Sequence, residues 1–128
     1  MSMIRIDTAD PHPIYEQIIE QYSRLLFLGV IPKDEPLPSV RTLAMELSVN
    51  PNTVQRAYQE LERQGYIYSI RGKGSFAADP KGFAEKEMEK LLVNVDASIR
   101  QALAAGITKV ELQARISQLL SDADGENS

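Results

Sequence analysis

Hydrogen-bond donors and cations gather in one stretch of this 128-residue sequence, between Asn50 and Lys73. The segment "NPNT" at 50–53 places two amides and a hydroxyl at the start of an amphipathic run. The segment "RGKG" at 71–74 places two cations in a glycine-rich turn. Side chains of these types hydrogen-bond to phosphates and to base edges. The pattern therefore predicts a surface that binds a negatively charged partner.

Residues 51–64 are expected to form the helix that carries this surface, with Asn50 as its N-cap and Pro51 in its first position. At about 100° per residue, one side of the helix collects the apolar residues Val54, Ala57, Tyr58 and Leu61. The opposite side collects the polar residues Asn52, Arg56, Gln59 and Arg63, with Glu60 and Glu62 toward its edges. Unpaired amides and the positive dipole end at the start of such a helix favour a nearby phosphate.

The apolar spacing along the rest of the chain predicts the elements that position this helix. Helices are expected at 14–28, 40–47, 51–64, 81–105 and from Thr108 onward, and strands at 66–70 and 75–78. Residues 1–12 are expected to form an irregular arm, and three prolines in 31–38 to exclude regular structure there. Two helices joined by a short turn and followed by a hairpin form a winged helix-turn-helix.

The predicted fold class is mostly α, within the α+β class: an N-terminal winged helix-turn-helix of three helices plus a β-hairpin, followed by two C-terminal helices. The predicted domains are the winged helix-turn-helix at 1–79, a helical dimerisation tail at 80–121 and a disordered C-terminus at 122–128. The tail carries an apolar stripe formed by Met88, Leu91, Leu92, Val95, Ile99 and Leu103. A second copy is expected to cover this stripe in a homodimer, the alternative being that the tail folds back on its own domain.

The composition excludes several classes of function. The sequence has no cysteine and a single histidine, His12, so thiol chemistry and a metal cluster are not expected, and we predict no cofactor. There is neither a Ser-His-Asp set nor a complete phosphate-binding loop, so we predict that the chain is not an enzyme. No apolar run approaches the roughly 20 residues of a membrane span. The N-terminus lacks a signal peptide, so a cytoplasmic protein without a membrane partner is expected.

The net charge of −4 argues mildly against a nucleic-acid partner, but its distribution matters more than its sum. Between Pro36 and Ala78, five basic residues outnumber three acidic ones. Lys73 lies in a narrow glycine turn that suits a minor-groove or backbone contact. Arg56 is long enough to reach a guanine edge, and Arg41 can clamp a phosphate. The candidate surface is thus locally basic.

The segment "LPSVRTLAMELSVNPNTVQRAYQELERQGYIYSIRGKGSF", residues 37–76, closely resembles the DNA-binding domain of the GntR family of bacterial transcription regulators. The segment "PIYEQIIEQ" from Pro13 is similar to the first helix of that family. Only 49 residues follow Asp79, which resembles the YtrA-type branch, whose short tail serves dimerisation. The resemblance implies a sequence-specific DNA-binding regulator, a repressor rather than an activator, that binds a pseudo-palindromic double-stranded operator as a homodimer.

The resemblance also implies which residues contact DNA. Carried over position by position, the DNA contacts of the family fall on Arg41, Asn50, Asn52, Thr53, Arg56, Lys73 and Gly74. The position of Gln55 touches DNA in some members, often as arginine, but here it is uncharged. Arg71, in the same turn as Lys73, completes the candidate set.

Other readings stay open from the residues. The winged helix could serve only as a protein-interaction module, without DNA binding. RNA binding is disfavoured because the aromatic residues are better explained as core than as exposed platforms for stacking bases. An unknown small-molecule effector could bind at the dimer interface or between the tail and the domain, although no residue in the sequence marks its site.

Overall fold

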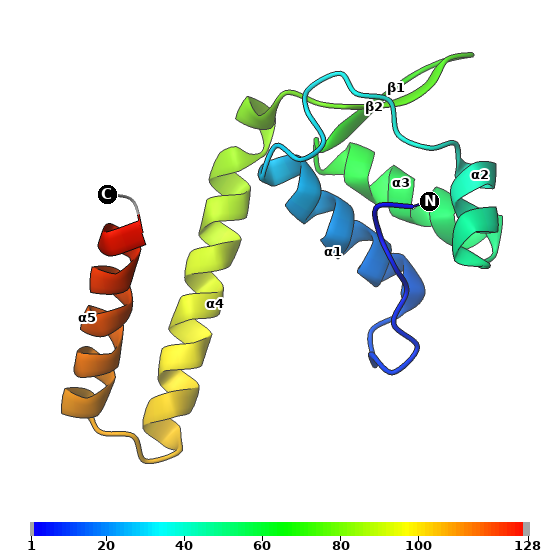
Figure 1. Ribbon diagram of the computed structural model, residues 1–128. Coiled ribbons are helices and arrows are strands. Elements are labelled where there is room, and N and C mark those ends of the chain that lie inside the picture. Colours follow the sequence, from blue (N-terminus) through cyan, green and yellow to red (C-terminus); the bar gives the residue numbers. More distant parts are fainter. Residues whose placement is uncertain (1, 127–128) are drawn as a thin grey trace. The chain divides into compact units, whose positions relative to one another are not determined.

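The computed structural model describes residues 2–126, and the chain divides into two compact units between Glu87 and Met88 (Figure 1). The elements of the first unit are α1 (Ile14–Phe27), α2 (Val40–Leu47), α3 (Pro51–Arg63), β1 (Ile67–Ile70), β2 (Gly74–Ala77) and the 3₁₀ turn η1 (Pro80–Gly82). Helix α4 (Ala84–Ala104) begins in the first unit and continues into the second, which also holds α5 (Lys109–Glu126). This order confirms the predicted fold class, a winged helix-turn-helix followed by two helices.

Two N-caps and one left-handed residue define the start of α2 and the turn between α2 and α3. The Ser39 side chain accepts a hydrogen bond from the Thr42 amide at 3.0 Å, and the Asn50 side chain accepts one from the Asn52 amide at 2.8 Å. Ser48 ends α2 with φ of +56°, a conformation that residues other than glycine rarely adopt. Both predicted caps are therefore present, and they fix where α2 and α3 start.

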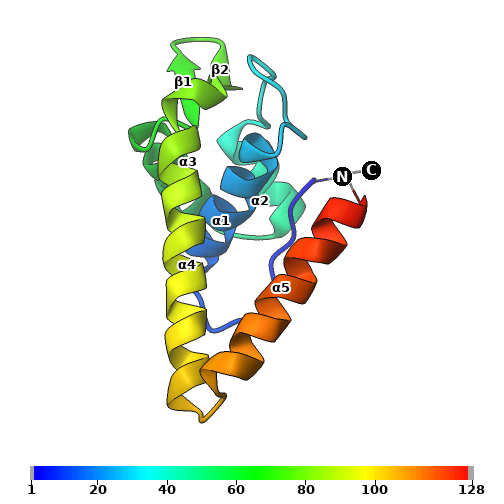
Figure 2. The same cartoon turned by 90° about the vertical axis from the view of Figure 1, so that its left-hand side faces the viewer.

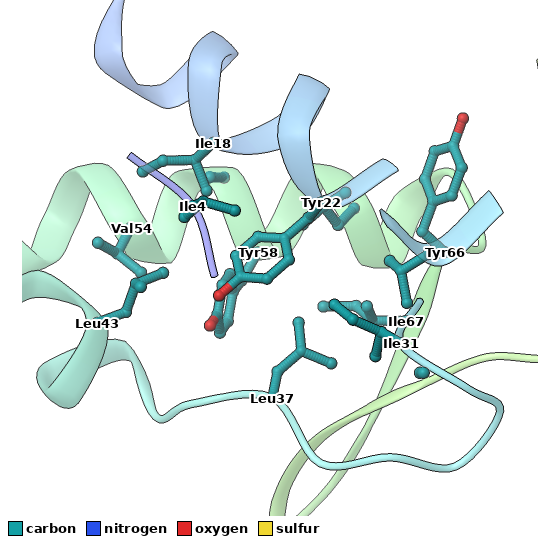
Figure 3. Close-up of a cluster of buried hydrophobic side chains, with 14 of the residues drawn as sticks. Ile4, Ile18, Tyr22, Ile31, Leu37, Leu43, Val54, Tyr58, Tyr66 and Ile67 are labelled. Carbon is teal, nitrogen blue, oxygen red and sulfur yellow. The ribbon is translucent and has the colours of Figure 1, made fainter. Parts of the chain in front are cut away.

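The core of the first unit lies between α1, α2 and α3, as the labelled side chains in Figure 3 show. The predicted apolar side of α3 is buried in full: Val54, Ala57, Tyr58 and Leu61. Tyr58 packs edge-on against Tyr22 of α1 and donates its hydroxyl to the Pro38 carbonyl at 2.8 Å. Burial raises the pKa of the Tyr58 hydroxyl, which therefore keeps the proton that it donates. Because this side of α3 packs inward, its polar side faces outward.

The N-terminal arm is irregular over residues 2–13 but is bound firmly to α1. Ile4 is buried in the core, and two glutamines of α1 hold the backbone that follows it. Gln21 accepts from the Arg5 amide and donates to the Arg5 carbonyl, which imitates a pair of strand hydrogen bonds. The buried Gln17 accepts a hydrogen bond from the Asp7 amide and donates to the carbonyls of Asp7 and His12. The arm is thus part of the packed unit.

Strands β1 and β2 form an antiparallel hairpin with Ile70 opposite Gly74. The Lys73 amide donates to the Ile70 carbonyl at 2.9 Å, which closes a tight turn at the tip. Gly72 and Gly74 have φ of +81° and +111°, conformations that side-chain-bearing residues rarely adopt. The glycines on either side of Lys73 are therefore required by the backbone of this turn.

The segment 34–37 pairs with β2 although the sequence predicted no regular structure there. Asp34 and Leu37 donate backbone hydrogen bonds to the Ala77 and Ser75 carbonyls at 2.8 and 2.9 Å. The Tyr68 hydroxyl also donates to the Asp34 carboxylate at 2.7 Å. Prolines are tolerated here because the segment is an edge and pairs on one side only. The hairpin is thereby fixed to the chain that leads into α2.

The second unit consists of helix without a core of its own among the described residues. Helices α4 and α5 are joined through Gly106, with φ of +102°, and Thr108 caps α5 as predicted by accepting from the Glu111 amide. The last residue of the buried core is Phe83, which precedes α4. Most of the predicted stripe on α4 is exposed, with Ile99 half-buried.

Two predicted boundaries differ from the structure. The contact boundary lies after Glu87 and not after Asp79, because Phe83 is buried and the Tyr66 hydroxyl donates to Glu87. The structure places 122–126 in α5, which continues through Glu126, where the sequence predicted a disordered C-terminus from residue 122. The polar composition of this segment favours solvent exposure but includes no proline to end a helix. Residues 127–128 lie outside the described residues.

Candidate nucleic-acid interface

The polar side of α3 is exposed along its whole length, as the sequence predicted. The predicted side chains Asn52, Arg56, Gln59 and Arg63 are exposed, and Gln55 is exposed beside them. Thr53 is half-buried at the margin between this side and the core. The side chains that pack inward fix the rotation of α3 and so decide which residues can meet a partner.

The amides at the start of α3 differ from the sequence prediction, which treated them as unpaired. The Asn52 amide is taken by the Asn50 side chain, and the Thr53 and Val54 amides donate to the Asn50 carbonyl. Pro51 has no amide to donate. A phosphate at this end would therefore be bound by side chains and by the helix dipole. The cap uses the oxygen of the Asn50 side chain, so the NH₂ group of that side chain can still donate outward.

The two arginines on the exposed side of α3 have different surroundings. Arg63 forms an ion pair with Glu60, with Nε 2.9 Å from Oε2, so the stripe is less free of carboxylates than the sequence suggested. The hydrogen bond with Glu60 raises the pKa of Arg63 above its ordinary value. Arg56 instead lies over the ring of Tyr15 from α1, with its guanidinium carbon 3.8 Å from the ring centroid. Of these two arginines, only Arg56 therefore lacks a carboxylate partner in the described part of the chain.

Further cations lie outside α3, on α2 and on the hairpin. Arg41 is exposed in the first turn of α2. Arg71, Lys73 and Gly74 are exposed at the tip of the hairpin. None of these cations forms an ion pair within residues 2–126. They therefore keep their full charge for a partner.

All of the candidate DNA contacts lie in the first unit, where the packing relates them. Strand β1 packs against α3, and both views show the hairpin above α3 (Figures 1 and 2). Helix α2 packs against α3 as well. One packed body thus carries the polar side of α3, the start of α2 and the tip of the hairpin.

A family model described as bacterial regulatory proteins, gntR family, matches residues 14–76. The HTH-type transcriptional repressor YtrA of Bacillus subtilis is 38% identical over 125 residues, covering 96% of each chain. The chain belongs to the GntR family. The family match runs from α1 to β2, while the YtrA match extends over the helices that follow. The predicted family and its YtrA-type branch are therefore confirmed.

Solved structures agree with this assignment. A GntR family transcriptional regulator from Listeria monocytogenes is 33% identical, with a TM-score of 0.75, covering 88% of this chain and 98% of that one. The DNA-binding domain of AraR, in complex with operator ORE1, is 28% identical with a TM-score of 0.51, covering 61% of this chain and 95% of that one. The GntR fold of this chain thus resembles one that has been seen bound to an operator.

Family membership establishes the broad function of the chain. GntR proteins and the curated relatives are DNA-binding regulators of transcription, which confirms the prediction that this member is not an enzyme. Two structural findings concern other kinds of site. The described residues contain no cluster of metal-ligating side chains. None of the helices within residues 2–126 has the length and apolarity that crossing a membrane requires.

Tyr15 was missed by the sequence reasoning. Its contact with Arg56 joins residues on two different helices, so no local spacing could indicate it. The signal that was available is the resemblance of "PIYEQIIEQ" to the first helix of the family, which places a tyrosine near the start of α1.

Proposed function

We propose that this GntR protein represses transcription by binding a pseudo-palindromic operator as a homodimer. Helix α3 of each copy would enter the major groove, and the hairpin would contact the neighbouring backbone or minor groove. The observation that carries the proposal is that Arg41, Arg56, Arg71 and Lys73 are all exposed on the first unit, without a carboxylate partner among the described residues. Repression would act in the cytoplasm, where the operator DNA is.

The contacts divide into those that hold the backbone and those that read bases. Asn50, Asn52 and Thr53 lie at the start of α3, where short side chains allow a close approach to the duplex. Arg56, one turn further along, has the fork that matches the O6 and N7 atoms of guanine. Gln55 is exposed beside it and offers an amide. Arg41, Arg71, Lys73 and Gly74 would bind phosphates and fix the register.

Homodimer formation is supported by the second unit, which contributes nothing to the buried core of the described chain. The α4 stripe of Met88, Leu91, Leu92, Val95, Ile99 and Leu103 runs over about four turns, and all but Ile99 are exposed by two fifths or more. A contiguous apolar face of this length is rarely left in water. A two-fold dimer through α4 would present two α3 helices to two half-sites.

Selection of bound oligonucleotides from a random pool tests DNA binding, because an enriched motif with two-fold symmetry is expected. The selected duplex then serves to titrate Arg41→Gln and Arg56→Gln, each of which should weaken binding by roughly five- to hundredfold. Arg24→Gln is the matched control, because Arg24 is an exposed arginine of α1 that pairs with Glu20 outside the candidate surface.

The competing function is a winged helix that binds only a protein. Under that reading no motif would be enriched, and neutralising Arg41 and Arg56 would change DNA affinity no more than the Arg24 control. Affinity that stays constant as salt rises would also contradict the proposal, because phosphate contacts release counterions.

A further inference from the structure

The two exposed arginines of α3 are held in chemically different ways. Arg63 is held by a carboxylate, because Glu60 accepts hydrogen bonds from its Nε and from one of its terminal nitrogens. Arg56 is held by an aromatic ring, because its guanidinium carbon lies 3.8 Å from the centroid of Tyr15. A cation over the face of a tyrosine is attracted by the quadrupole of the ring.

A ring partner and a carboxylate partner leave an arginine with different abilities. The carboxylate of Glu60 neutralises Arg63 and occupies part of its donor fork. The ring of Tyr15 accepts none of the in-plane N–H groups, so it fixes Arg56 without using its donors. Within residues 2–126, no ion pair or hydrogen bond of the Arg56 side chain competes with this arrangement. Arg56 is therefore both oriented and available.

The position of the ring is itself fixed. Tyr15 is the second residue of α1, is half-buried, and packs against the edge of the core. Helices α1 and α3 pack directly against each other. The packing that builds the fold therefore also sets the place of the ring beneath Arg56.

Without the ring of Tyr15, the guanidinium of Arg56 could turn toward nearby carboxylates. Arg56 and Tyr15 line a surface groove whose wall also contains the carboxylates of Asp7, Glu16 and Glu20. If Arg56 paired with one of these carboxylates, its guanidinium would not be available to bind an anionic partner. The ring thus competes with nearby carboxylates for the orientation of one side chain.

We propose that Tyr15 is a positioning residue for DNA recognition, which holds Arg56 in its binding orientation before DNA arrives. This inference rests on the proposed function of α3 as the base-reading helix. An arginine that is already ordered loses less rotamer freedom on binding, so the contact with a guanine edge costs less. Removing the face of the ring should weaken operator binding by about two- to fivefold, the size of an exposed cation–π contact.

The test uses the full chain and the selected operator, with affinities measured by fluorescence anisotropy. Tyr15→Phe keeps the ring face and should bind as the wild type does. Tyr15→Leu keeps apolar packing without a π face and should bind about two- to fivefold more weakly. In an Arg56→Gln background, Tyr15→Leu should cause no further loss, because the group that it positions is gone.

Three outcomes would overturn the proposal. An equal loss in both backgrounds would mean that Tyr15 acts through the fold and not through Arg56. A loss on Tyr15→Phe would mean that the hydroxyl itself contacts DNA. Unchanged or tighter binding by Tyr15→Leu would mean that the ring does not assist Arg56 or withholds it from DNA.

A second readout needs no DNA and separates this inference from the proposed function. The δ-methylene protons of Arg56 should show an upfield ring-current shift in the NMR spectrum of the free wild-type protein. The shift should persist in Tyr15→Phe and vanish in Tyr15→Leu. Absence of the shift in the wild type would overturn the positioning role even if operator binding holds. If the upfield shift is present but the protein selects no operator, the proposed function has failed. The role of Tyr15 in DNA recognition then fails too, although Tyr15 still orients Arg56.

Discussion

Helices α3 and α4 are both amphipathic, but only α3 has its apolar side covered within the described chain. Val54 of α3 has no exposed surface, whereas Leu92 of α4 is 59% exposed. The apolar side of α3 meets α1 and α2 and thereby turns a polar side outward. The apolar side of α4 is itself turned outward. The comparison teaches that an amphipathic pattern predicts a partner without saying which chain supplies it.

Charging the outward side of α4 should give the largest effect. Replacing both Leu92 and Val95 by glutamate should dissociate the proposed homodimer and lower affinity for a two-half-site operator by about 10²–10⁴-fold, because the second half-site is no longer tethered. Light scattering should show the mass falling from twice 14.3 kDa to 14.3 kDa.

The matched control is Gln101→Glu, which adds a like charge on the opposite side of α4 and should change neither mass nor affinity. A double variant that remains dimeric would show that the stripe is not the interface.

Truncating the inward side of α3 should give the next largest effect, on stability. Leu61→Ala should lower the free energy of unfolding by about 2–5 kcal/mol, because Leu61 is fully buried and a cavity would remain. Urea unfolding followed by tyrosine fluorescence is the measurement, since all five tyrosines precede Met88. Leu92→Ala in α4 should leave this transition unchanged at a concentration that keeps both proteins in one oligomeric state.

Removing the cap of α3 should separate its structural and binding roles. Asn50→Ala should lower the free energy of unfolding by about 1 kcal/mol, because the Asn52 amide loses its acceptor. Asn50→Asp should retain the cap and hence the stability, yet weaken operator binding, because it replaces an outward donor with a negative charge. Equal operator binding by Asn50→Asp and wild type would remove Asn50 from the DNA contacts.

Neutralising the tip of the hairpin should give the smallest effect, visible mainly in the salt dependence. Lys73→Ala should reduce the slope of log affinity against log salt by about one and weaken all sequences alike, because a phosphate contact carries no base information. Lys86→Ala, an exposed lysine at the start of α4, is the control and should leave the slope unchanged.

The sequence predicted most of the elements because their signals are local. The caps at Ser39 and Asn50, the inward set on α3 and the glycine turn around Lys73 all follow from residues that are close together in the sequence. The sequence analysis placed Glu60 toward the edge of the polar side and did not predict its ion pair with Arg63. The contact of Arg56 with Tyr15 depends on the angle at which α1 crosses α3, which no spacing encodes.

Two misjudged segments show how composition misleads. Three prolines in 31–38 suggested a loop without pairing, but proline is excluded only where a backbone N–H must donate. The segment pairs with β2 through the amides of Asp34 and Leu37, and Pro36 lies opposite Phe76 without donating. The polar residues after 121 suggested disorder, yet α5 continues to Glu126. In both segments the backbone is more ordered than the composition suggested.

The attachment of the hairpin to residues 34–37 has a consequence for the operator under the proposed function. Backbone hydrogen bonds join β2, whose turn carries Lys73, to the residues that lead directly into the start of α2, which carries Arg41. We therefore expect the hairpin tip and the start of α2 to keep a fixed spacing. The distance between these two DNA contacts would then be set by the fold and would not adapt to the DNA. A half-site lengthened by a single base pair, about 3.4 Å along the duplex, could then meet either Lys73 or Arg41 but not both.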